Sequence, residues 1–504
     1  MKRALFALAP FAFAAFACGS PQATTNVAPP TSAAPSASAP TPSASADSFG
    51  PRPEPPTPAA FKPPAPVVYT ATNGVTVWLV ERHGLPIVSI AIAVPSGAAN
   101  DPPGKGGLAR ITAQMLDEGA GARSAIDVSR DVDALGATLA TTSDADTSTA
   151  SLTVLKRNLQ KGFAILGDVV ARPRFEPKEW KRVHDLWQNS LKARASDPDA
   201  TARVVFRAAV FGADHPYAHP WDGTSASAKA VTLDDVKSFH ASAWRPERAT
   251  IVVAGDVTKE ELAPLLDASF SSWKPAAKSA ALPIVTPPAP KGPWPRVVLV
   301  DRPEAPQSVI AVVRPGVAAS DPDAPALDRV NGALGGSFTS RINQDLREEH
   351  GWSYGASSRI SFSRGTGMIV AYAGVYTDKT GDALAALLKD IDELAKKGLT
   401  QDEVDKTRAQ ARGELVEAYE SVQSVVSRLA TAAALGLGPD YEARASVARD
   451  QATAADLNKL AAKYFDPKDA IVVVVGPRAQ VEPAIAAAGL PKPELRDADG
   501  APVK

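Results

Sequence analysis

The chain has 504 residues, which is enough for two or more domains. Its 54 basic and 55 acidic residues give a net charge of −1 and form no long runs of one sign, which argues against nucleic acid or another polyanion as a partner. The single cysteine excludes an intramolecular disulfide.

The N-terminus has the pattern of an export signal. A basic start precedes an apolar run, residues 4–17, that is too short to span a membrane. Cys18 follows directly and resembles the lipidated cysteine of bacterial lipoproteins; a plain signal peptide cut after Ala17 is the alternative. Residues 19–66 are rich in proline, alanine and serine and predict an extended, disordered tether. We therefore expect residues 1–18 to be a signal peptide and the exported protein to be lipid-anchored in a bacterial cell envelope, on the periplasmic side of the outer membrane.

The rest of the chain contains an internal repeat. Three separated segments match at a nearly constant offset of 220 (299 − 79) or 221 (476 − 255) residues: Leu79-Val80-Glu81-Arg82 with Leu299-Val300-Asp301-Arg302, Asp101-Pro102 with Asp321-Pro322, and the apolar strand before Gly255 with that before Gly476. Agreement at three places indicates two copies of one fold, each of typical domain size.

The sequence pattern predicts the same order of strands and helices in each copy. Two strands come first, helices and an alternating stretch follow, and a helix and a strand close the copy. This grouping predicts an α+β fold in which helices cover one face of a mainly antiparallel sheet. The expected strands and alternating stretches are residues 75–80, 87–94, 138–154 and 250–254, then 297–300, 308–313, 357–375 and 471–475. The expected helical stretches include residues 177–195, 201–210, 232–243, 381–397, 400–435 and 455–464.

The proline content places the domain boundaries. An N-terminal domain covers residues 67–274, a proline-rich linker residues 275–296, and a C-terminal domain residues 297–490. Residues 491–504 are expected to be a frayed tail.

One helix of the first copy carries a family signature. It is opened by glycines, runs to about Gly119 and reads Gly107-Leu108-Ala109-Arg110-Ile111-Thr112-Ala113-Gln114-Met115-Leu116. This frame resembles the zinc-binding helix of the insulinase (pitrilysin, mitochondrial processing peptidase) metallopeptidases, which carries His-x-x-Glu-His. Arg110, Ala113 and Gln114 stand where that motif has its first histidine, its glutamate and its second histidine. The resemblance also places the family's third ligand, a glutamate, near Ser190.

These replacements remove the chemistry of a zinc peptidase. A catalytic zinc takes three protein ligands and activates a water, whose proton a carboxylate accepts. Arg110 keeps a positive charge, Gln114 offers only a neutral carbonyl, and Ala113 has no acid or base. We expect no catalytic residue and no bound metal in this half, with zinc held instead by a partner subunit.

A pair of histidines offers an alternative metal site. His215 and His219 are four residues apart, as in helical zinc motifs, but each precedes a proline that favours extended backbone. His215-Pro216-Tyr217 also resembles a loop of the family that binds no metal. An active peptidase with its metal displaced to these histidines ranks last, because no glutamate base is suitably spaced.

The second copy keeps the family's substrate-binding signature. Leu334-Gly335-Gly336-Ser337-Phe338-Thr339-Ser340-Arg341-Ile342, followed by Leu346-Arg347-Glu348-Glu349-His350-Gly351-Trp352-Ser353-Tyr354, resembles it over its whole length. In active members an arginine and a tyrosine seven residues apart reach across the substrate cleft. The resemblance implies that Arg347 holds substrate carbonyls and that Tyr354 donates a hydrogen bond to the oxyanion.

The resemblance covers residues 67–490 and implies two homologous domains arranged as a clamshell around a peptide. We predict a non-catalytic subunit of a heterodimeric zinc endopeptidase, inactive alone, that supplies Arg347 and Tyr354 in trans to a partner with an intact His-x-x-Glu-His motif. The substrate is an unfolded peptide bound by strand addition to a sheet edge. The alternative from another class is a stand-alone peptide-binding or scaffold lipoprotein of the cell envelope.

Overall fold

The computed structural model describes residues 61–274, 280–292 and 296–503. The expected signal peptide, Cys18 and the first part of the tether lie outside the described residues. Within the described ranges, no helix combines the length and apolar character needed to cross a bilayer.

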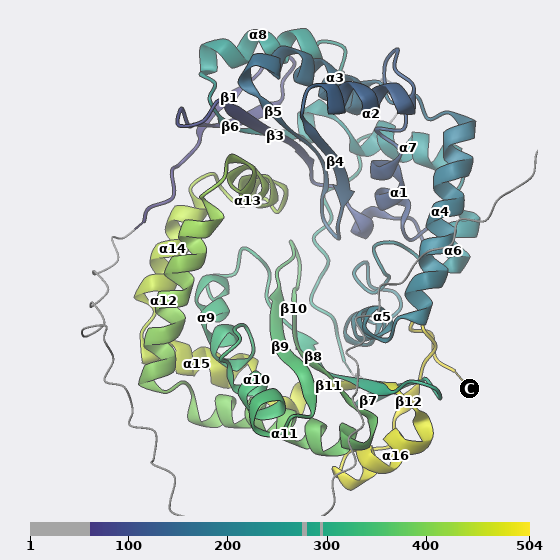
Figure 1. Ribbon diagram of the computed structural model, residues 1–504, viewed down its shortest axis with the longest axis vertical. Coiled ribbons are helices and arrows are strands. Elements are labelled where there is room, and N and C mark those ends of the chain that lie inside the picture. Colours follow the sequence, from purple (N-terminus) through teal and green to yellow (C-terminus); the bar gives the residue numbers. More distant parts are fainter. Residues whose placement is uncertain (1–60, 275–279, 293–295, 504) are drawn as a thin grey trace, which may run out of the picture. The chain divides into compact units, whose positions relative to one another are not determined.

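The first half is built on a six-stranded sheet with the strand order β1-β2-β6-β3-β5-β4 (Figure 1). Only β2 and β6 pair in parallel, and the other neighbours are antiparallel. At one edge of the sheet, β4 pairs with β5 and alternates between exposed and half-buried residues. The strands are β1 (Val67–Thr70), β2 (Thr76–Glu81), β3 (Ile87–Val94), β4 (Thr138–Ser143), β5 (Ser148–Leu155) and β6 (Thr250–Gly255).

The second half repeats this topology in the order β12-β7-β11-β8-β10-β9. β7 and β11 are parallel, as β2 and β6 are, and the remaining shared strands correspond one to one, which confirms the internal repeat. Residues 491–504 are not a frayed tail, because they supply β12, which pairs in parallel with β7. The strands are β7 (Val297–Asp301), β8 (Gln307–Pro315), β9 (Ser353–Ser361), β10 (Met368–Tyr376), β11 (Ile471–Gly476) and β12 (Glu494–Leu495).

The helices begin where side chains can cap them. Ser124, Thr232 and Thr258 each accept a hydrogen bond from a backbone N–H three residues on, at the starts of α2, α7 and α8. The first-half helices are α1 (Leu108–Gln114), α2 (Ala125–Ala134), α3 (Leu159–Ala171), α4 (Pro177–Ser196), α5 (Pro198–Phe211), α6 (Ser225–Ala230), α7 (Leu233–Ala243) and α8 (Lys259–Phe270). Short 3₁₀ turns are η1 (Ala98–Asn100), η2 (Lys156–Asn158), η3 (Pro246–Arg248), η5 (Thr377–Lys379) and η6 (Pro467–Asp469).

The helical stretch expected over residues 400–435 is divided in two. α12 ends at Ala418, and Ser421 caps α13 by accepting a hydrogen bond from Ser424 N at 3.0 Å. The second-half helices are α9 (Ala324–Leu334), α10 (Arg341–Asn343), the π-helical η4 (Gln344–Glu349), α11 (Thr380–Lys397), α12 (Gln401–Ala418), α13 (Val422–Ala434), α14 (Tyr441–Gln451), α15 (Ala454–Tyr464) and α16 (Arg478–Ala487).

Within each half, the helices cover one face of the sheet, as expected. The second face of each sheet is covered by a helix of the other half: α13 packs on β3 and β6, and α5 packs on β8 and β11 (Figure 1). Val252 therefore shares a core with Leu429, and Val205 shares one with Val473. Because each fully buried aliphatic side chain contributes roughly 1.5–3 kcal/mol, these two shared cores bind the halves together.

A buried polar junction also joins the halves. Asp146, which is 2% exposed, accepts hydrogen bonds from the Tyr217 hydroxyl at 2.6 Å and from Arg364 N at 2.8 Å. The Tyr217 oxygen accepts a further bond from Gly365 N at 3.1 Å. Burial and the neighbouring Asp146 carboxylate raise the pKa of Tyr217, so the hydroxyl stays protonated and can donate.

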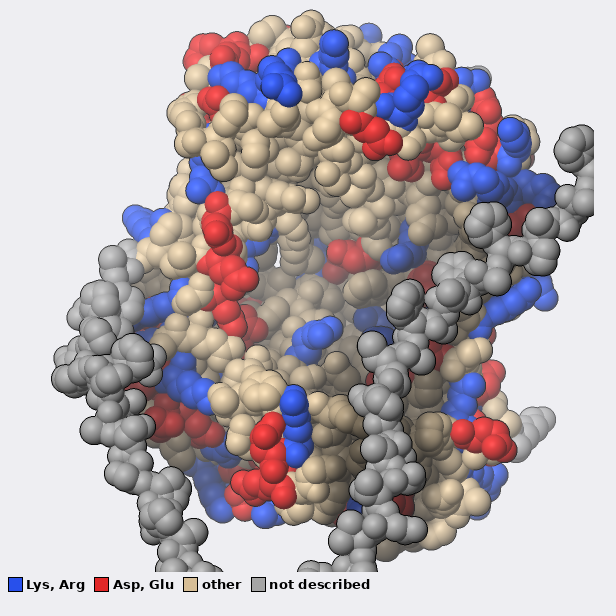
Figure 2. All heavy atoms as spheres, viewed as in Figure 1, with Lys and Arg blue, Asp and Glu red and all other residues tan. Residues whose placement is uncertain are grey.

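The molecular surface carries both signs of charge. Basic and acidic side chains are interspersed over the visible face, and both occur on the walls of the hollow at its centre (Figure 2). This mixture agrees with the net charge of −1.

Candidate functional site

Helix α1 carries three of the positions at which the family places its zinc chemistry. It begins at Leu108 because Asp101 accepts hydrogen bonds from Gly107 N at 2.7 Å and Ala109 N at 2.8 Å. Burial raises the pKa of Asp101 to about 8. Gly107 has φ +92° and lies against Trp187 of α4, so a side chain there would be strained and would collide with the indole.

The helix is shorter than expected. It ends at Gln114, not near Gly119, although Met115 and Leu116 remain fully buried in the first-half core. Ala113 is also fully buried, whereas Arg110 and Gln114 are exposed. Neither exposed side chain makes a hydrogen bond or ion pair to a described residue.

The matching position on α4 offers no ligand either. Ser190 is exposed, and its hydroxyl donates to Trp187 O of its own helix at 2.8 Å. A guanidinium, a methyl group, a neutral amide and a hydroxyl do not fit the nitrogen, thiolate and carboxylate ligands that zinc prefers. The residues at these four positions therefore do not fit the zinc ion that the resemblance implies.

The two histidines of the alternative site are engaged elsewhere. His215 Nε2 lies 2.9 Å from Pro288 O, and its Nδ1 accepts a hydrogen bond from Tyr217 N at 3.0 Å. His219 Nδ1 lies 3.2 Å from Pro220 O. Both ring nitrogens of His215 are thus engaged in hydrogen bonds, which argues against a displaced zinc site at these histidines.

A separate cluster of possible metal ligands lies on the signature segment of the second half. Within the residues that the structure describes, one group of possible ligand atoms lies within 4.8 Å of one another, and it belongs to Asp345, Glu349 and His350. His350 Nδ1 is 2.6 Å from Asp345 Oδ1, and the His350 ring stacks on Trp352 at 4.0 Å. These contacts pair the cluster internally, on the segment η4 of the second half.

The substrate-binding signature folds into a close contact between a helix and a strand. A side chain at Gly335 would collide with Ser358 N, so glycine at the end of α9 allows β9 to approach. Asn343 consolidates the segment by donating to Phe338 O at 2.6 Å and accepting from Ala356 N at 3.1 Å. The turn that carries Arg347 is thus held against the first residues of β9.

Arg347 and Tyr354 lie among exposed aromatic rings. The Arg347 guanidinium lies 4.6 Å from the centre of the Phe338 ring and pairs with Glu348 at 3.2 Å. Tyr354 is 76% exposed, and its hydroxyl lies 3.4 Å from that of Tyr376. Phe338, Tyr354 and Tyr376 are large aromatic side chains that gain little by facing water, which is typical of a binding surface.

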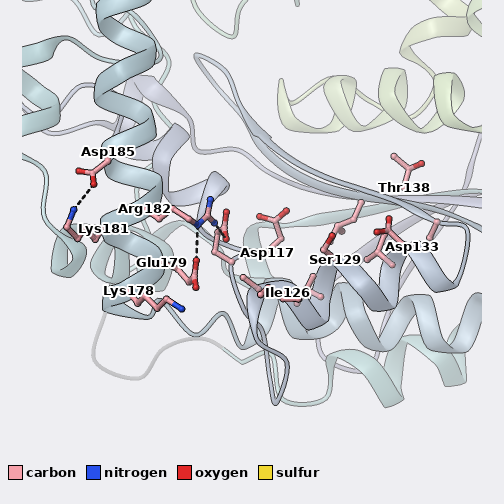
Figure 3. Close-up of a pocket in the computed structure, with 16 residues that line it drawn as sticks. Asp117, Ile126, Ser129, Asp133, Thr138, Lys178, Glu179, Lys181, Arg182 and Asp185 are labelled. Atoms are coloured by element: carbon pink, nitrogen blue, oxygen red, sulfur yellow. Dashed lines mark hydrogen bonds and ion pairs between the residues drawn. The ribbon is translucent and has the colours of Figure 1, made fainter. Parts of the chain in front are cut away.

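A groove of about 960 Å³ lies beside the edge strand β4, between α2 and α4 (Figure 3). Thr138 and Leu139 of β4 and Ile126 of α2 line it, and charged side chains of α4 form the opposite wall. Within that wall, Arg182 pairs with Glu179 at 3.0 Å. Burial raises the pKa of Asp117, at the end next to α1, to about 6. The groove therefore gives access to β4 from the side of the degenerate zinc helix.

A second recess, of about 520 Å³, contains Arg110 in its wall. The other walls come from α5, from the segment around Trp221 and from β8, β9 and β10 of the second half. Sequence reasoning singled out only Arg110 here and missed Arg203, Arg207 and Arg359. The available signal was the spacing of Arg203 and Arg207, four residues apart on the otherwise apolar α5.

Family models match both halves of the chain. The model described as insulinase (peptidase family M16) matches residues 76–215, and the model described as peptidase M16 inactive domain matches residues 230–411. The chain belongs to the insulinase family. The two matched ranges contain α1 and the Arg347 segment respectively, which confirms the family expected from those two motifs.

The relatives of this chain include proteins named as zinc proteases and one named as a non-peptidase homologue. The chain is 28% identical to an uncharacterised zinc protease of Mycobacterium leprae, over 70% of this chain and 79% of that protein. It is 24% identical to the non-peptidase homologue YmxG of Helicobacter pylori, over 65% of this chain and 74% of that protein. The solved structure of a peptidase M16 inactive domain from Pseudomonas fluorescens superposes with a TM-score of 0.76 at 22% identity, covering 82% of this chain and 98% of that one. This likeness confirms the α+β clamshell fold of two homologous repeats.

Among insulinase-family members, this chain fits the non-catalytic kind. The positions of both motif histidines and of the glutamate base hold Arg110, Gln114 and Ala113. The non-peptidase homologue among its relatives agrees with that assignment.

Proposed function

We propose that this chain is the non-catalytic subunit of a heterodimeric insulinase-family endopeptidase, in which the partner chain holds the zinc and this chain completes the substrate cleft. The observation that carries the proposal is the asymmetry between the halves. Arg110, Ala113 and Gln114 have no zinc chemistry, whereas a half-exposed Arg347 and an exposed Tyr354 are both present.

The contacts of Arg347 and Tyr354 suit a role in trans. The Tyr354 hydroxyl has one long contact, to Tyr376 at 3.4 Å, so it is free to donate to an oxyanion that forms on a bound peptide. The Arg347 guanidinium rests on the Phe338 ring, which orients it while leaving N–H groups free for peptide carbonyls. In this chain both groups face solvent, where a second subunit can reach them.

The groove beside β4 supports the proposed peptide binding. β4 pairs with β5 along one side, and Thr138 and Leu139 line the groove on the other. An extended peptide can add there as a further strand, with its main chain bonded to β4 and alternate side chains in the groove. The substrate class is therefore an unfolded peptide.

The location belongs to the same proposal. Cys18 at the end of an apolar signal core, followed by a charge-poor tether, supports a lipid anchor in the bacterial cell envelope on the periplasmic side of the outer membrane. An anchored subunit would hold the partner's zinc site close to that membrane.

A stand-alone peptide-binding or scaffold lipoprotein is the second candidate. The β4 groove favours it, because strand addition needs no catalytic group. The two candidates differ in whether a mixture with a catalytic homologue cleaves peptide.

The decisive experiment combines this chain with a homologue that has an intact His-x-x-Glu-His motif. Neither chain alone should cleave an unfolded peptide well, and the mixture should. Tyr354→Phe should lower turnover by roughly 100- to 1,000-fold, the usual cost of one oxyanion donor, without changing heterodimer affinity. Tyr69→Phe is the matched control, because the buried Tyr69 hydroxyl makes no hydrogen bond and lies outside the signature segment.

Two results would contradict the proposal. No activity from any mixture would favour the scaffold candidate. Full activity of the Tyr354→Phe mixture would show that Tyr354 does not stabilise the oxyanion, even if the two chains associate.

A further inference from the structure

The recess beside Arg110 is unusually rich in arginine. Five arginines line its volume of about 520 Å³: Arg110 from α1, Arg194 from α4, Arg203 and Arg207 from α5, and Arg359 from β9. They come from both halves of the chain, so the recess exists only in the folded protein. Its volume lies within the range of about 300–1,000 Å³ that is usual for ligand pockets.

The positive charge of this recess is only partly neutralised. Arg194 is paired, because it donates to Asp222 Oδ1 at 2.7 Å and to Asp499 Oδ1 at 2.8 Å. The only other acidic group in the lining is Asp199, and no described ion pair joins it to an arginine. Four guanidinium groups therefore share the recess with one free carboxylate, and the recess is cationic.

Among these four arginines, Arg207 gives the strongest evidence for an anion-binding site. It emerges from the apolar helix α5, and its guanidinium carbon lies 4.6 Å from the centre of the Trp221 ring. Within the described ranges it makes no hydrogen bond and no ion pair. Burial lowers the pKa of Arg207 to about 10, because protein replaces the water around the charge, and the nearby Asp144 and Asp146 carboxylates compensate only in part. Arg207 is half-buried at the recess, so its N–H groups can donate to an anion that enters.

The remaining wall is apolar. Val309 and Ala311 of β8, with Met368 and Val370 of β10, form one side of the recess, and the Trp221 ring holds Arg207 on another. A free inorganic anion would gain nothing from this surface. A ligand with a carboxylate next to an apolar group would use both parts.

We propose that this recess binds the carboxylate of a peptide segment, through Arg207 and the neighbouring Arg110, Arg203 and Arg359, with an adjacent apolar side chain against the β8 and β10 wall. The planar guanidinium fork matches a carboxylate with two parallel hydrogen bonds. The carboxylate can come from an acidic side chain or from a free C-terminus. Only the assumption that the ligand is a peptide rests on the proposed function, and the preference for an anion stands on the recess alone.

The test measures binding to this chain alone, without a catalytic partner. Fluorescence anisotropy compares extended, apolar labelled peptides in four forms: free C-terminus against C-terminal amide, and internal Glu against Gln. The acidic form should bind at least about tenfold more tightly, and its affinity should fall with added salt. If only the C-terminal pair of peptides differs in affinity, the recess binds a free C-terminus. If only the Glu and Gln pair differs, it binds an acidic side chain.

Substitutions then locate the interaction. Arg207→Gln and Arg359→Gln should each weaken the acidic peptide by about 10- to 100-fold, the range for a hydrogen bond to a charged group, and leave the neutral peptide unchanged. Arg157→Gln is the matched control, because Arg157 is exposed on η2 outside the recess and makes no described side-chain bond. If Arg207→Gln lowers the melting temperature, the comparison relies on Arg359→Gln, because Arg359 is exposed on β9 and its replacement should not disturb folding.

Three results would overturn the inference. The first is equal affinity for acidic and neutral peptides, or no binding of any peptide. The second is unchanged affinity in both arginine variants. The third is inorganic phosphate alone competing at the same concentration as the acidic peptide, since the apolar wall would then contribute nothing. Because proteolysis by the mixture is a separate readout, failure here and failure of the proposed subunit role are distinguishable.

Discussion

The hydroxyl of Tyr217 is a sensitive point at which to test how the two halves are joined. Tyr217→Phe keeps the ring, which is 1% exposed and packs against Phe211 with ring centres 5.5 Å apart. It removes one donor to Asp146 and one acceptor for Gly365 N. The substitution therefore changes hydrogen bonding without creating a large cavity.

The expected cost follows from those two bonds. The bond to the Asp146 carboxylate is charge-assisted and contributes roughly 1.5–3 kcal/mol, and leaving the buried Gly365 N–H without a partner costs roughly 1–3 kcal/mol. Asp146 keeps its bond from Arg364 N, so the junction is weakened but not lost. We expect the free energy of unfolding to fall by about 2.5–6 kcal/mol, a large part of the usual 5–15 kcal/mol.

The assay is urea unfolding of the full chain, followed by the fluorescence of its eight tryptophans. Tyr69→Phe is the control, because the Tyr69 hydroxyl is buried without a hydrogen-bond partner. Tyr217→Phe should shift the midpoint strongly and Tyr69→Phe should not. Equal shifts in the two variants would refute the reasoning that this junction stabilises the contact between the halves.

Three further predictions test the metal, the anchor and one buried acid. After dialysis, elemental analysis should find no stoichiometric zinc, because Arg110 and Gln114 replace the two histidines; one zinc per chain would contradict this. Cys18→Ser should move the protein from the membrane to the soluble fraction, and a variant that stays with the membrane would show that Cys18 is not the anchor. Burial raises the pKa of Asp101 from 3.8 to about 8, so its ionisation is penalised in the folded state and the free energy of unfolding should fall as pH rises through that interval. Asp101→Asn should flatten this decline in urea midpoints measured at pH 5 and pH 8, and equal slopes would argue against the raised pKa.

The sequence predicted what depends on local pattern. Short apolar runs and the repeat offset were enough to place β2, β3, β6 and their counterparts β7, β8 and β11, because such runs and matching motifs are read within one segment. Residue identity alone also decided that α1 lacks zinc ligands, since Arg110, Ala113 and Gln114 cannot acquire that chemistry from their surroundings. Local pattern was less reliable at helix ends: the apolar stripe of α1 continues to Met115, although the helix stops at Gln114.

The tertiary structure decided what depends on contacts between distant segments. The apolar face of α5 fits either half by composition, and only packing places it on β8 and β11 while α13 covers β3 and β6. β12 has too few residues to show a period, and it is a strand because β7 offers it an unpaired edge. The arginine recess is the clearest case: Arg110, Arg207 and Arg359 lie far apart in sequence and on different elements. Their shared surroundings arise only when the second sheet folds against α5, because burial and electrostatic environment are properties of the assembled chain.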